Sequence, residues 1–428
     1  MLNVSLFNSG DIVAVALSGG KDSMCLLNLL LENAQKLGIT VKAVNIDHSI
    51  RKIESENDSK FVKTYCQSLN VPLFFKKVDA INYSKQNGYS LEQGARELRY
   101  SVFKEAIESG FCTKIATAHH ANDNFETVLF NMFRGSGVQG LTGIKAISNG
   151  VIRPLINATR NEIDEYVLKN NIPFVEDSTN LNADYTRNYI RLNIVPKILE
   201  KFNGAIDSVS RLTKTLQEED EFLNDLAKNV IAMREGNFCL PTTLQPVIFK
   251  RATLLVLKEL GITKDYEKAH IDGVFSLLNL KNGSQISLPN GVICIREYDS
   301  VVFYKNLETL NSPVYNFEVK TFDFNGAEVK IERCLKRDKG LYIDENKVPK
   351  TAVIRNRQNG DVFTKFGGGT KKLKDYLIDK KIPKIKRDSL VVLASGSDIL
   401  AIFGVEISEK VKVDEFTKSV LKLSITKK

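Results

Sequence analysis

Residues 18–23 read Ser18-Gly19-Gly20-Lys21-Asp22-Ser23, and they lie between an apolar run over 12–17 and a helix-type run over 24–37. A strand that enters a glycine-rich turn and then a helix directs backbone N–H groups and the positive end of the helix dipole at one point, which suits it to bind phosphate. The two glycines permit close backbone approach, and the lysine adds a positive charge. A carboxylate beside polyphosphate is repulsive unless a divalent cation lies between them, so Asp22 predicts a Mg²⁺ ligand. We therefore predict that this segment binds a nucleotide.

The turn is not a Walker A loop. That loop needs a glycine five residues before the Gly-Lys pair and a Ser or Thr directly after the lysine, but Val15 and Asp22 stand there. An ordinary strand-to-helix connection is the alternative interpretation of two glycines alone. The full hexapeptide resembles the PP-loop of the ATP-pyrophosphatase family, whose members cleave ATP between the α and β phosphates. The resemblance implies that residues 18–23 bind ATP.

Composition limits the class of protein. A chain of 428 residues, 43% of them hydrophobic, is long enough for two or three domains with buried cores. No apolar stretch approaches the ~20 residues of a membrane span, and no secretion signal is visible, so we expect a cytoplasmic protein without a membrane partner. The six cysteines form no C-x-x-C pair, which argues against a zinc site, an iron–sulfur cluster and a disulfide framework.

Positive charge is concentrated near the C-terminus. The formal charge is +9 with a pI near 9.0, and residues 365–387 hold nine basic side chains against two acidic ones. A solvated helix face is the alternative interpretation. The glycine turn over 366–370 directly before the lysines favours a basic helix that binds a phosphate backbone. The lysines we select are Lys371, Lys372 and Lys374.

The first two hundred residues alternate β-type runs with helix-type segments, which predicts an α/β fold with a doubly wound parallel sheet. The strands are predicted over 12–17, 41–47, 73–78, 114–118 and 151–155. The helices are predicted over 24–37, 54–69, 91–109 and 123–133, with a capping box at Thr159 to Glu162 opening another.

In such sheets ligands bind beyond the carboxyl ends of the strands. Polar residues stand at three of these ends, at Ser18, at Asp47-His48 and at His119-His120. We therefore expect these segments to converge on one crevice, with Asp47 and His48 beside the nucleotide.

The chain divides into four predicted parts. Residues 1–210 form the PP-loop catalytic domain, and 211–305 form a mainly helical middle domain whose helical region runs to Lys258, with β-type runs later. Residues 306–333 form a linker, and 334–428 form a small, basic α+β domain.

Residues 118–127 carry the densest chemistry after the phosphate loop. His119 and His120 show no metal-ligand spacing, so hydrogen bonding to nucleotide or proton transfer are the functional interpretations, and a structural role is the alternative. Asp123 and Glu126 are three apart and share a helix face, where they could hold Mg²⁺ or recognise an amine.

Two arginine pairs are candidates for binding phosphate or RNA. Arg96 and Arg99 share one helix face, and Arg187 and Arg191 share another, downstream of a polar cluster over 177–184. Surface ion pairs are the alternative for both.

Together these segments resemble the tRNA(Ile)-lysidine synthetase family. The resemblance rests on the phosphate loop, Asp47-His48 with Arg51, residues 118–127, the glycine-rich 135–143, Arg153-Pro-Leu155, Arg187 to Arg191, and the C-terminal 367–376 with Ile382-Pro383. It implies ATP-dependent attachment of free L-lysine to the 2-position of the wobble cytidine of a CAU-anticodon tRNA(Ile), which changes decoding from AUG to AUA. ATP would first adenylate the 2-keto oxygen, and the lysine amine would then displace AMP.

The resemblance also implies roles for these residues. Residues Lys21, Asp22, His119, Asp123 and Arg187 would be catalytic, and ATP and Mg²⁺ would bind at residues 18–23 with Asp22 as the metal ligand. The substrate and tRNA residues would be Arg96, Arg99, Glu126, Arg191, Lys371, Lys372 and Lys374. No motif specifies the oligomeric state, and we allow for a homodimer.

One departure from the family concerns the carboxylates. The family commonly has Asp-Asp-Gln where this chain has Asn122-Asp123-Asn124, so Asp123 is expected to serve the lysine amine alone. Rival functions are a PP-loop tRNA 2-thiocytidine-type synthetase, a non-catalytic RNA-binding protein and a small-molecule synthetase. The missing C-x-x-C pairs disfavour the first, and the basic C-terminal segment disfavours the last.

Overall fold

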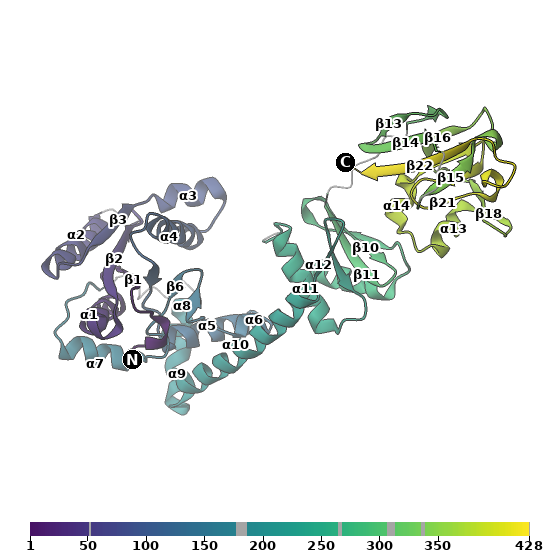
Figure 1. The fold of residues 1–428 in the computed structure, drawn as a ribbon. Helices are drawn as coiled ribbons and strands as arrows, with labels where there is room; N and C mark the ends of the chain where they lie inside the picture. The colour runs from purple at the N-terminus through teal and green to yellow at the C-terminus, as the bar shows by residue number, and fades with distance from the viewer. Residues whose placement is uncertain (51–52, 177–185, 264–267, 306–312, 335–338, 428) are drawn as a thin grey trace. The chain divides into compact units, whose positions relative to one another are not determined.

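The computed structural model describes the chain except residues 51–52, 177–185, 264–267, 306–312, 335–338 and 428 (Figure 1). Arg51 and the whole 177–184 cluster therefore lie outside the described residues. The chain forms two compact units, Met1–Phe222 and Leu223–Lys428. No helix among the described residues is long and apolar enough to cross a membrane.

The first unit is built on a six-stranded sheet in the order β3-β2-β1-β4-β6-β5. All its pairs are parallel except the β5–β6 hairpin. The strands are β1 Ile12–Ala16, β2 Thr40–Asp47, β3 Leu73–Lys77, β4 Lys114–Ala116, β5 Ile147–Ser148 and β6 Val151–Ile152.

Helices cover both faces of this sheet. Alternate residues of β1 point to opposite faces, so Val13 and Val15 pack in one core and Ala14 in the other. Helices over 21–37, 53–68 and 160–169 pack in the first core, and the helix over 91–108 packs in the second. This confirms the predicted doubly wound fold.

The helices of the first unit include every predicted segment, and the helices over 80–87, 138–141 and 195–201 are additions. They are α1 Lys21–Leu37, α2 Ile53–Ser68, α3 Ala80–Asn87, α4 Leu91–Glu108, α5 Ala121–Phe133, α6 Val138–Leu141, α7 Arg160–Lys169, α8 Thr186–Tyr189, the π-helical turn η3 Ile190–Ile194, α9 Val195–Lys201 and α10 Ala205–Asn229, which runs past the boundary of the unit. The capping box of α7 is present, because the Glu162 N–H donates to Thr159 Oγ1 and the Thr159 N–H donates to Glu162 Oε2.

The middle part combines helices with a five-stranded antiparallel sheet in the order β7-β8-β11-β10-β9. Its elements are β7 Ala232–Arg234, β8 Asn237–Pro241, α11 Pro246–Glu259, α12 Lys268–Ser276, β9 Gln285–Ser287, β10 Val292–Glu297 and β11 Ser300–Lys305.

The prediction of a helical region running to Lys258 was wrong over 230–245. Arg234 pairs with Asn237, and both intervening residues have positive φ, 51° at Glu235 and 79° at Gly236. Positive φ at both central positions is the backbone of a two-residue hairpin turn, so the chain reverses there and pairs β7 with β8.

The C-terminal part contains two sheets, one of seven strands and one of four. Its strands are β12 Tyr315–Asn316, β13 Thr321–Phe324, β14 Ala327–Arg333, β15 Leu341–Asp344, β16 Val353–Asn356, β17 Val362–Thr364, β18 Thr370–Lys372, β19 Val391–Ser395, β20 Asp398–Ile402, β21 Glu406–Ile407 and β22 Val420–Lys427. Two short helices, α13 Leu373–Asp379 and α14 Lys384–Ser389, complete it.

The glycine turn near the C-terminus does not open a basic helix, contrary to the prediction. Thr364 pairs with Thr370, so the glycines over 367–369 close a hairpin between β17 and β18. The basic stretch is therefore divided among a strand and two short helices.

Candidate active site

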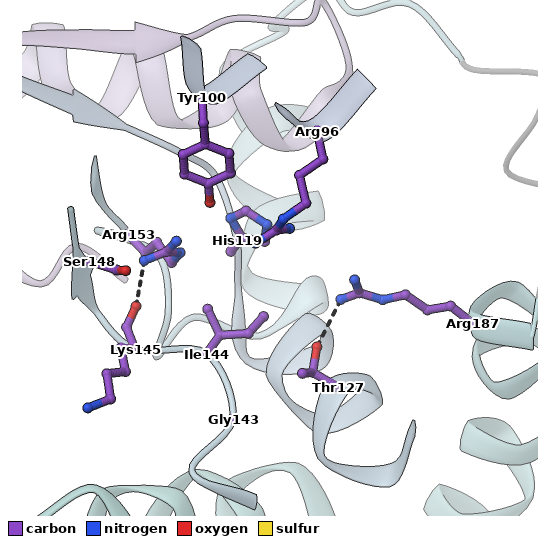
Figure 2. Close-up of a pocket in the computed structure, with 10 residues that line it drawn as sticks. All are labelled: Arg96, Tyr100, His119, Thr127, Gly143, Ile144, Lys145, Ser148, Arg153 and Arg187. Atoms are coloured by element: carbon purple, nitrogen blue, oxygen red, sulfur yellow. Dashed lines mark hydrogen bonds between the residues drawn. The ribbon is translucent and has the colours of Figure 1, made fainter. Parts of the chain in front are cut away.

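A cavity of about 280 Å³ lies within the first unit (Figure 2). Helices α4, α5 and α8 bound it, together with the loop that follows β4 and the segments on either side of the β5–β6 hairpin. The lining residues are Arg96, Tyr100, His119, Thr127, Gly143, Ile144, Lys145, Ser148, Arg153 and Arg187. We call it the arginine cavity, because three guanidinium groups and no carboxylate line it.

His119 lines this cavity, and a hydrogen bond holds its ring in a fixed orientation. Its Nδ1 lies 3.0 Å from Thr117 Oγ1. Burial, with contributions from Arg153 and Arg187, lowers the pKa of His119 to about 4, although the Asp123 carboxylate opposes the shift. The ring is therefore neutral at pH 7.

The lowered pKa of His119 predicts that the folded chain becomes less stable as the pH decreases. The unfolded chain binds a proton at this histidine below pH ~6.5, and the folded chain does so only near pH 4, so stability is lost as the pH falls through this window. The shift corresponds to about 3 kcal/mol. We expect His119→Asn to flatten the dependence of the unfolding free energy on pH between 7 and 4.5, as measured by urea denaturation. Parallel curves of unfolding free energy against pH for the variant and the wild type would contradict this prediction.

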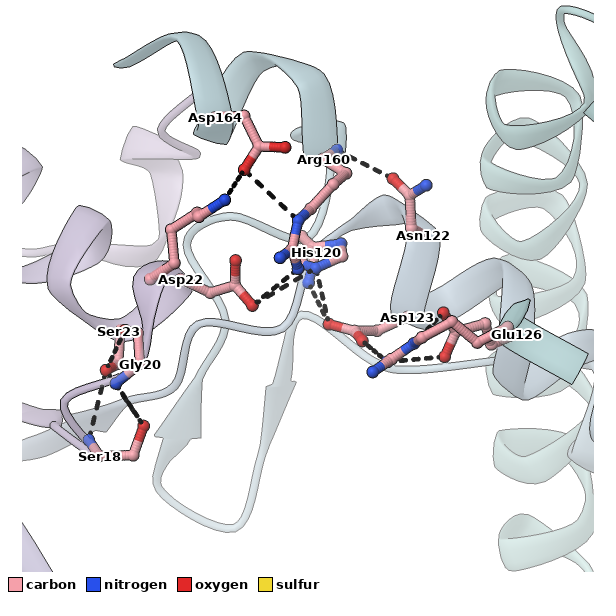
Figure 3. A network of polar contacts seen from close by, with 12 residues as sticks. Ser18, Gly20, Asp22, Ser23, His120, Asn122, Asp123, Glu126, Arg160 and Asp164 are labelled. Carbon is pink, nitrogen blue, oxygen red and sulfur yellow. Dashed lines mark hydrogen bonds and ion pairs between the residues drawn. The ribbon is translucent and has the colours of Figure 1, made fainter. Parts of the chain in front are cut away.

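The phosphate loop, residues 18–23, is braced by its own hydroxyl groups (Figure 3). Ser18 Oγ accepts a hydrogen bond from the Gly20 N–H at 3.3 Å, and Ser23 Oγ donates to the Gly20 carbonyl at 2.9 Å. Gly19 has φ +88°, and a Cβ there would lie 3.3 Å from Val62 Cγ2. The backbone is therefore fixed in the conformation that a phosphate cradle requires.

Helix α7 supplies the ionic partners of the loop. Lys21 Nζ lies 2.9 Å from Asp164 Oδ1, and Asp22 Oδ2 lies 3.3 Å from Arg160 Nη1. Arg160 and Asp164 also pair with each other at 3.5 Å. Neither residue was among the predicted site residues, yet both contact the charged side chains of the loop.

His120 lies between the loop and helix α5. Its Nε2 is 3.8 Å from Asp22 Oδ2 and 3.5 Å from Asp123 Oδ2, and its side chain is buried (Figure 3). The structure thus brings Asp22 and Asp123 to the same imidazole. We predicted His119 as the catalytic histidine, but His120 is the one that contacts both carboxylates.

Asp123 and Glu126 project from one face of α5 and share a partner. Arg191 donates from Nε to Glu126 Oε1 at 2.7 Å, and from Nη2 to Glu126 Oε2 at 2.8 Å and to Asp123 Oδ1 at 3.1 Å. Burial raises the pKa of Asp123, but His120 and its backbone N–H, with His119 and Arg191, more than offset this and lower it. The hydrogen bond to Glu126 raises the pKa of Arg191. The two carboxylates of α5 therefore bind one guanidinium group, that of Arg191.

Arg187 contacts the same helix from α8. Its Nη2 donates to Thr127 Oγ1 at 3.0 Å and to the Asp123 carbonyl at 3.4 Å, and its Nε lies 3.7 Å from Glu126 Oε2. Arg187 and Arg191 therefore both contact α5, and Arg187 also lines the arginine cavity.

The two asparagines that replace family residues hold neighbouring backbone. Asn122 Oδ1 accepts from the Arg160 N–H at 2.9 Å, at the start of α7. Asn124 Oδ1 accepts from the Ile144 N–H at 2.7 Å. A Cβ at Gly143 would lie 2.1 Å from Asn124 Oδ1, so glycine is required there. Both amides are engaged within the protein, and Asp123 is the carboxylate of this triplet.

The remaining predicted residues of the first unit are Asp47, His48, Arg96 and Arg99. Asp47 is buried at the end of β2, where Oδ1 accepts from the Ser49 N–H at 2.8 Å. Burial, aided by Arg99, lowers the pKa of His48 to about 4 despite the neighbouring Asp47. Arg96 lines the arginine cavity, whereas Arg99 does not.

The three predicted lysines belong to the second unit. Lys371 forms an ion pair with Asp379 and lies 5.6 Å from the centre of the Tyr376 ring, whereas Lys372 and Lys374 are exposed. A second cavity, of about 310 Å³, adjoins Lys371 and Tyr376. Lys372 and Lys374 are therefore the two more accessible charges.

The sequence offered weak signals for the residues it missed. Arg160 and Asp164 follow a strand end and a capping box and are four apart, which places them on one helix face at the sheet edge where ligands bind. Tyr100 follows Arg96 by four positions and was not selected.

Comparison with known proteins agrees with this geometry. The PP-loop domain model matches residues 4–198, and the TilS substrate C-terminal domain model matches residues 352–423. The chain is 32% identical to the tRNA(Ile)-lysidine synthase of Caldanaerobacter subterraneus, over 99% of this chain and 95% of that protein. It is 32% identical to that of Clostridioides difficile, over 99% and 97%, and 33% identical to that of Thermotoga maritima, over 92% and 91%. The chain therefore belongs to the tRNA(Ile)-lysidine synthase family.

Proposed function

We propose that this chain joins free L-lysine to C2 of the wobble cytidine of a CAU-anticodon tRNA(Ile). In the first step the 2-keto oxygen attacks the α-phosphorus of ATP and pyrophosphate leaves. In the second step the lysine ε-nitrogen attacks C2, and AMP departs with the oxygen. The amine loses a proton, and lysidine is the product.

The observation that best supports this proposal is the position of His120, which lies close to both Asp22 and Asp123. One carboxylate belongs to the phosphate loop and the other to the carboxylate pair on α5, and the imidazole Nε2 lies within 3.8 Å of both. A nucleotide and an amine bound at these two places would be close enough to react with one base.

The residues of the loop suit the adenylation step. The backbone N–H groups at the start of α1 and the Lys21 ammonium would neutralise phosphate charge. Lys21 is paired with Asp164 at 2.9 Å, so ATP must compete with that carboxylate for the lysine. Arg160 is 3.3 Å from Asp22 and is the second cation available to the phosphates.

The loop also fits a Mg²⁺ ion held with ATP. Asp22 Oδ1 is buried and has no hydrogen-bond partner among the described residues, so one carboxylate oxygen is available. No cluster of three or more His, Cys, Asp or Glu side chains suited to a metal occurs in the part of the chain that the structure describes. Mg²⁺ is commonly held by one or two carboxylates plus substrate phosphates, and here it would neutralise the charge between Asp22 and the phosphates.

The carboxylate pair on α5 suits the lysine step. Asp123 and Glu126 are both bound to Arg191, so the site already accepts a cationic nitrogen. The lysine ammonium would share or replace these hydrogen bonds. The lowered pKa of Asp123 keeps its carboxylate ionised, so it would bind and orient the lysine ammonium. By position it is also the carboxylate that could accept the proton that the amine loses.

The test of this function is incorporation of labelled lysine. The chain is incubated with ATP, Mg²⁺, radiolabelled lysine and tRNA(Ile) with a CAU anticodon, and elongator tRNA(Met) serves as the control. We expect label in the wobble nucleoside of tRNA(Ile) alone. ATP cleavage without incorporation would favour a 2-thiocytidine-type synthetase or a small-molecule synthetase instead.

The exposed lysines of the second unit predict a salt-dependent tRNA affinity. Replacing Lys372 and Lys374 with Ala should weaken tRNA binding and reduce the dependence of log K on log salt by roughly 1 to 2, because each phosphate contact contributes about 0.7 to 0.9. ATP binding should not change. Lys169 and Lys201, exposed lysines of the first unit, provide a matched double substitution. If the two double substitutions weakened tRNA binding equally, the loss of affinity would follow from the lower net charge alone.

The assembly and division of the chain belong to the same proposal. We allow for a homodimer, and light scattering with and without tRNA measures the oligomeric state. We also retain 1–210 as the catalytic domain and 211–305 as a middle domain. The proposed tRNA-binding domain begins earlier than predicted, because β12, β13 and β14, which lie in the predicted linker over 306–333, pair within its two sheets.

A further inference from the structure

Residues 142–145, between α6 and β5, form one wall of the arginine cavity. Gly143, Ile144 and Lys145 line the cavity, and the segment belongs to no helix or strand. A partly buried backbone outside regular structure must find its hydrogen-bond partners elsewhere. Here side chains from other parts of the first unit supply them. We call residues 142–145 the wall segment.

Side chains of α10 and α5 hold the backbone of the wall segment. Gln217 Nε2, on α10, donates to the Thr142 carbonyl at 2.7 Å. Asn124 Oδ1, on α5, accepts from the Ile144 N–H at 2.7 Å. Two different helices therefore hold two backbone groups of this short segment.

Thr213 fixes which way the Asn124 amide faces. Its Oγ1 donates to the Ser210 carbonyl at 3.0 Å and accepts from Asn124 Nδ2 at 3.1 Å. Because the hydroxyl proton is already used, Thr213 presents a lone pair to the amide nitrogen, and the amide oxygen is left to face the Ile144 N–H. Thr213 and Asn124 are each 3% exposed, so water competes little for these hydrogen bonds.

Thr213 and Gln217 share one face of α10. They are four residues apart, and Glu221 follows four residues later, where its carboxylate lies 3.7 Å from the Lys145 ammonium. Asp220, which is buried, lies 4.0 Å from the same ammonium. Successive turns of this helix therefore face the wall segment, and all of these residues belong to the first unit.

The wall segment in turn holds groups at the active site. Arg153 Nη1 donates to the Lys145 carbonyl at 2.8 Å (Figure 2). Arg153 is buried and its Nε has no hydrogen-bond partner among the described residues, so the Nη1 contact is a main anchor of the guanidinium group. Asn124 directly follows Asp123 on α5. A shift of the wall segment would therefore disturb Arg153 and the helix turn that carries Asp123.

We propose that Thr213 and Gln217 are positioning residues for the reaction, which hold the wall segment, and through it Arg153 and α5, in the arrangement that aligns the reacting groups. The proposal rests on the function proposed above. Neither residue lines the arginine cavity, so neither would touch a substrate there. Their substitution should therefore lower the rate of adenylation and leave substrate affinity almost unchanged.

Two substitutions at one position separate the hydrogen bond from the shape of the side chain. Thr213→Val keeps the branched shape and loses the oxygen that accepts from Asn124, whereas Thr213→Ser keeps the oxygen and loses the methyl group. Gln217→Leu removes the donor to the wall segment. Thr215→Val is the control, because Thr215 is an exposed residue of the same helix whose hydroxyl group donates within the helix.

We measure kcat and the KM for tRNA(Ile) with a CAU anticodon in pyrophosphate release without lysine, the Kd of ATP, and hydrogen–deuterium exchange of the peptide that contains Ile144. For Thr213→Val and Gln217→Leu we expect a kcat about 10-fold lower, with KM and Kd within about twofold, because misplacement of reacting groups acts on the rate. Exchange of the peptide should be about 10-fold faster, because the wall segment opens more easily. Thr213→Ser and Thr215→Val should stay close to the wild type.

An unchanged kcat despite faster exchange would overturn the proposal, since the contacts of the wall segment would then be structural alone. Equal losses for Thr213→Ser and Thr213→Val would also overturn it for Thr213, since the methyl group would then matter and the hydrogen bond would not. Gln217 is partly buried, so Gln217→Leu keeps the test valid if Thr213→Val does not fold. Because pyrophosphate release is measured without lysine, a lower kcat in variants of a chain that incorporates no lysine would support the positioning role and reject the proposed product.

Discussion

Asp22→Asn should lower kcat/KM for adenylation by about 10³-fold, the scale on which removal of one electrostatic group acts in an active site. Asp22 is paired with Arg160 at 3.3 Å and lies 3.8 Å from His120, and its Oδ1 is buried without a hydrogen-bond partner among the described residues. The amide keeps the shape of the side chain and removes the charge that a divalent cation requires. The readout is tRNA-dependent pyrophosphate release without lysine, which isolates the first step.

Asp164→Asn is the matched control for this substitution. Asp164 contacts Lys21 at 2.9 Å and Arg160 at 3.5 Å, so it shares the same cations but lies outside the loop. We expect less than a 10-fold change, and the ATP affinity could rise because Lys21 is released. Comparable losses for both variants would mean that Asp22 acts only through the ion-pair network.

Asp123→Asn should raise the KM for lysine by about 10²-fold while leaving pyrophosphate release close to the wild-type rate. A hydrogen bond to a charged group contributes about 1.5 to 3 kcal/mol, which corresponds to this change in affinity. Asp123 Oδ2 accepts from the His120 N–H at 3.1 Å, and an amide oxygen can keep that bond. The charge presented to the amine is what the variant loses.

Asp123 also caps the start of α5, because its side chain accepts a hydrogen bond from the His120 N–H. Glu162 plays the equivalent part at the start of α7, where its Oε2 accepts from the Thr159 N–H at 2.7 Å. Glu162→Gln is therefore the control for this capping role. We expect a small loss of stability and an unchanged lysine KM. If Asp123→Asn slowed pyrophosphate release as much as lysidine formation, Asp123 would serve the adenylation step instead.

The local patterns of the chain were sufficient for the fold of the first unit. The apolar run over 12–17 and the glycine turn gave β1 and α1 within one to three residues of their observed bounds, and the capping box placed the start of α7. Such signals depend only on residues close together in the sequence, because helix and strand periodicity and capping are short-range effects. The hairpin over Glu235 and Gly236 was missed, since a two-residue turn between short strands carries little periodic signal.

The order of residues along the chain was enough to identify the phosphate loop, the parallel sheet that carries it and the family resemblance. Which charged side chains meet at the loop depends on how the chain folds. Lys21 and Asp164 are separated by 143 positions, and Arg160 and Asp22 by 138, so no local spacing relates them. Those contacts depend on the order of the strands and the packing of α7 beside α1. The unpartnered Nε of Arg153 likewise became visible only when burial removed water from it, which is a property of the folded chain.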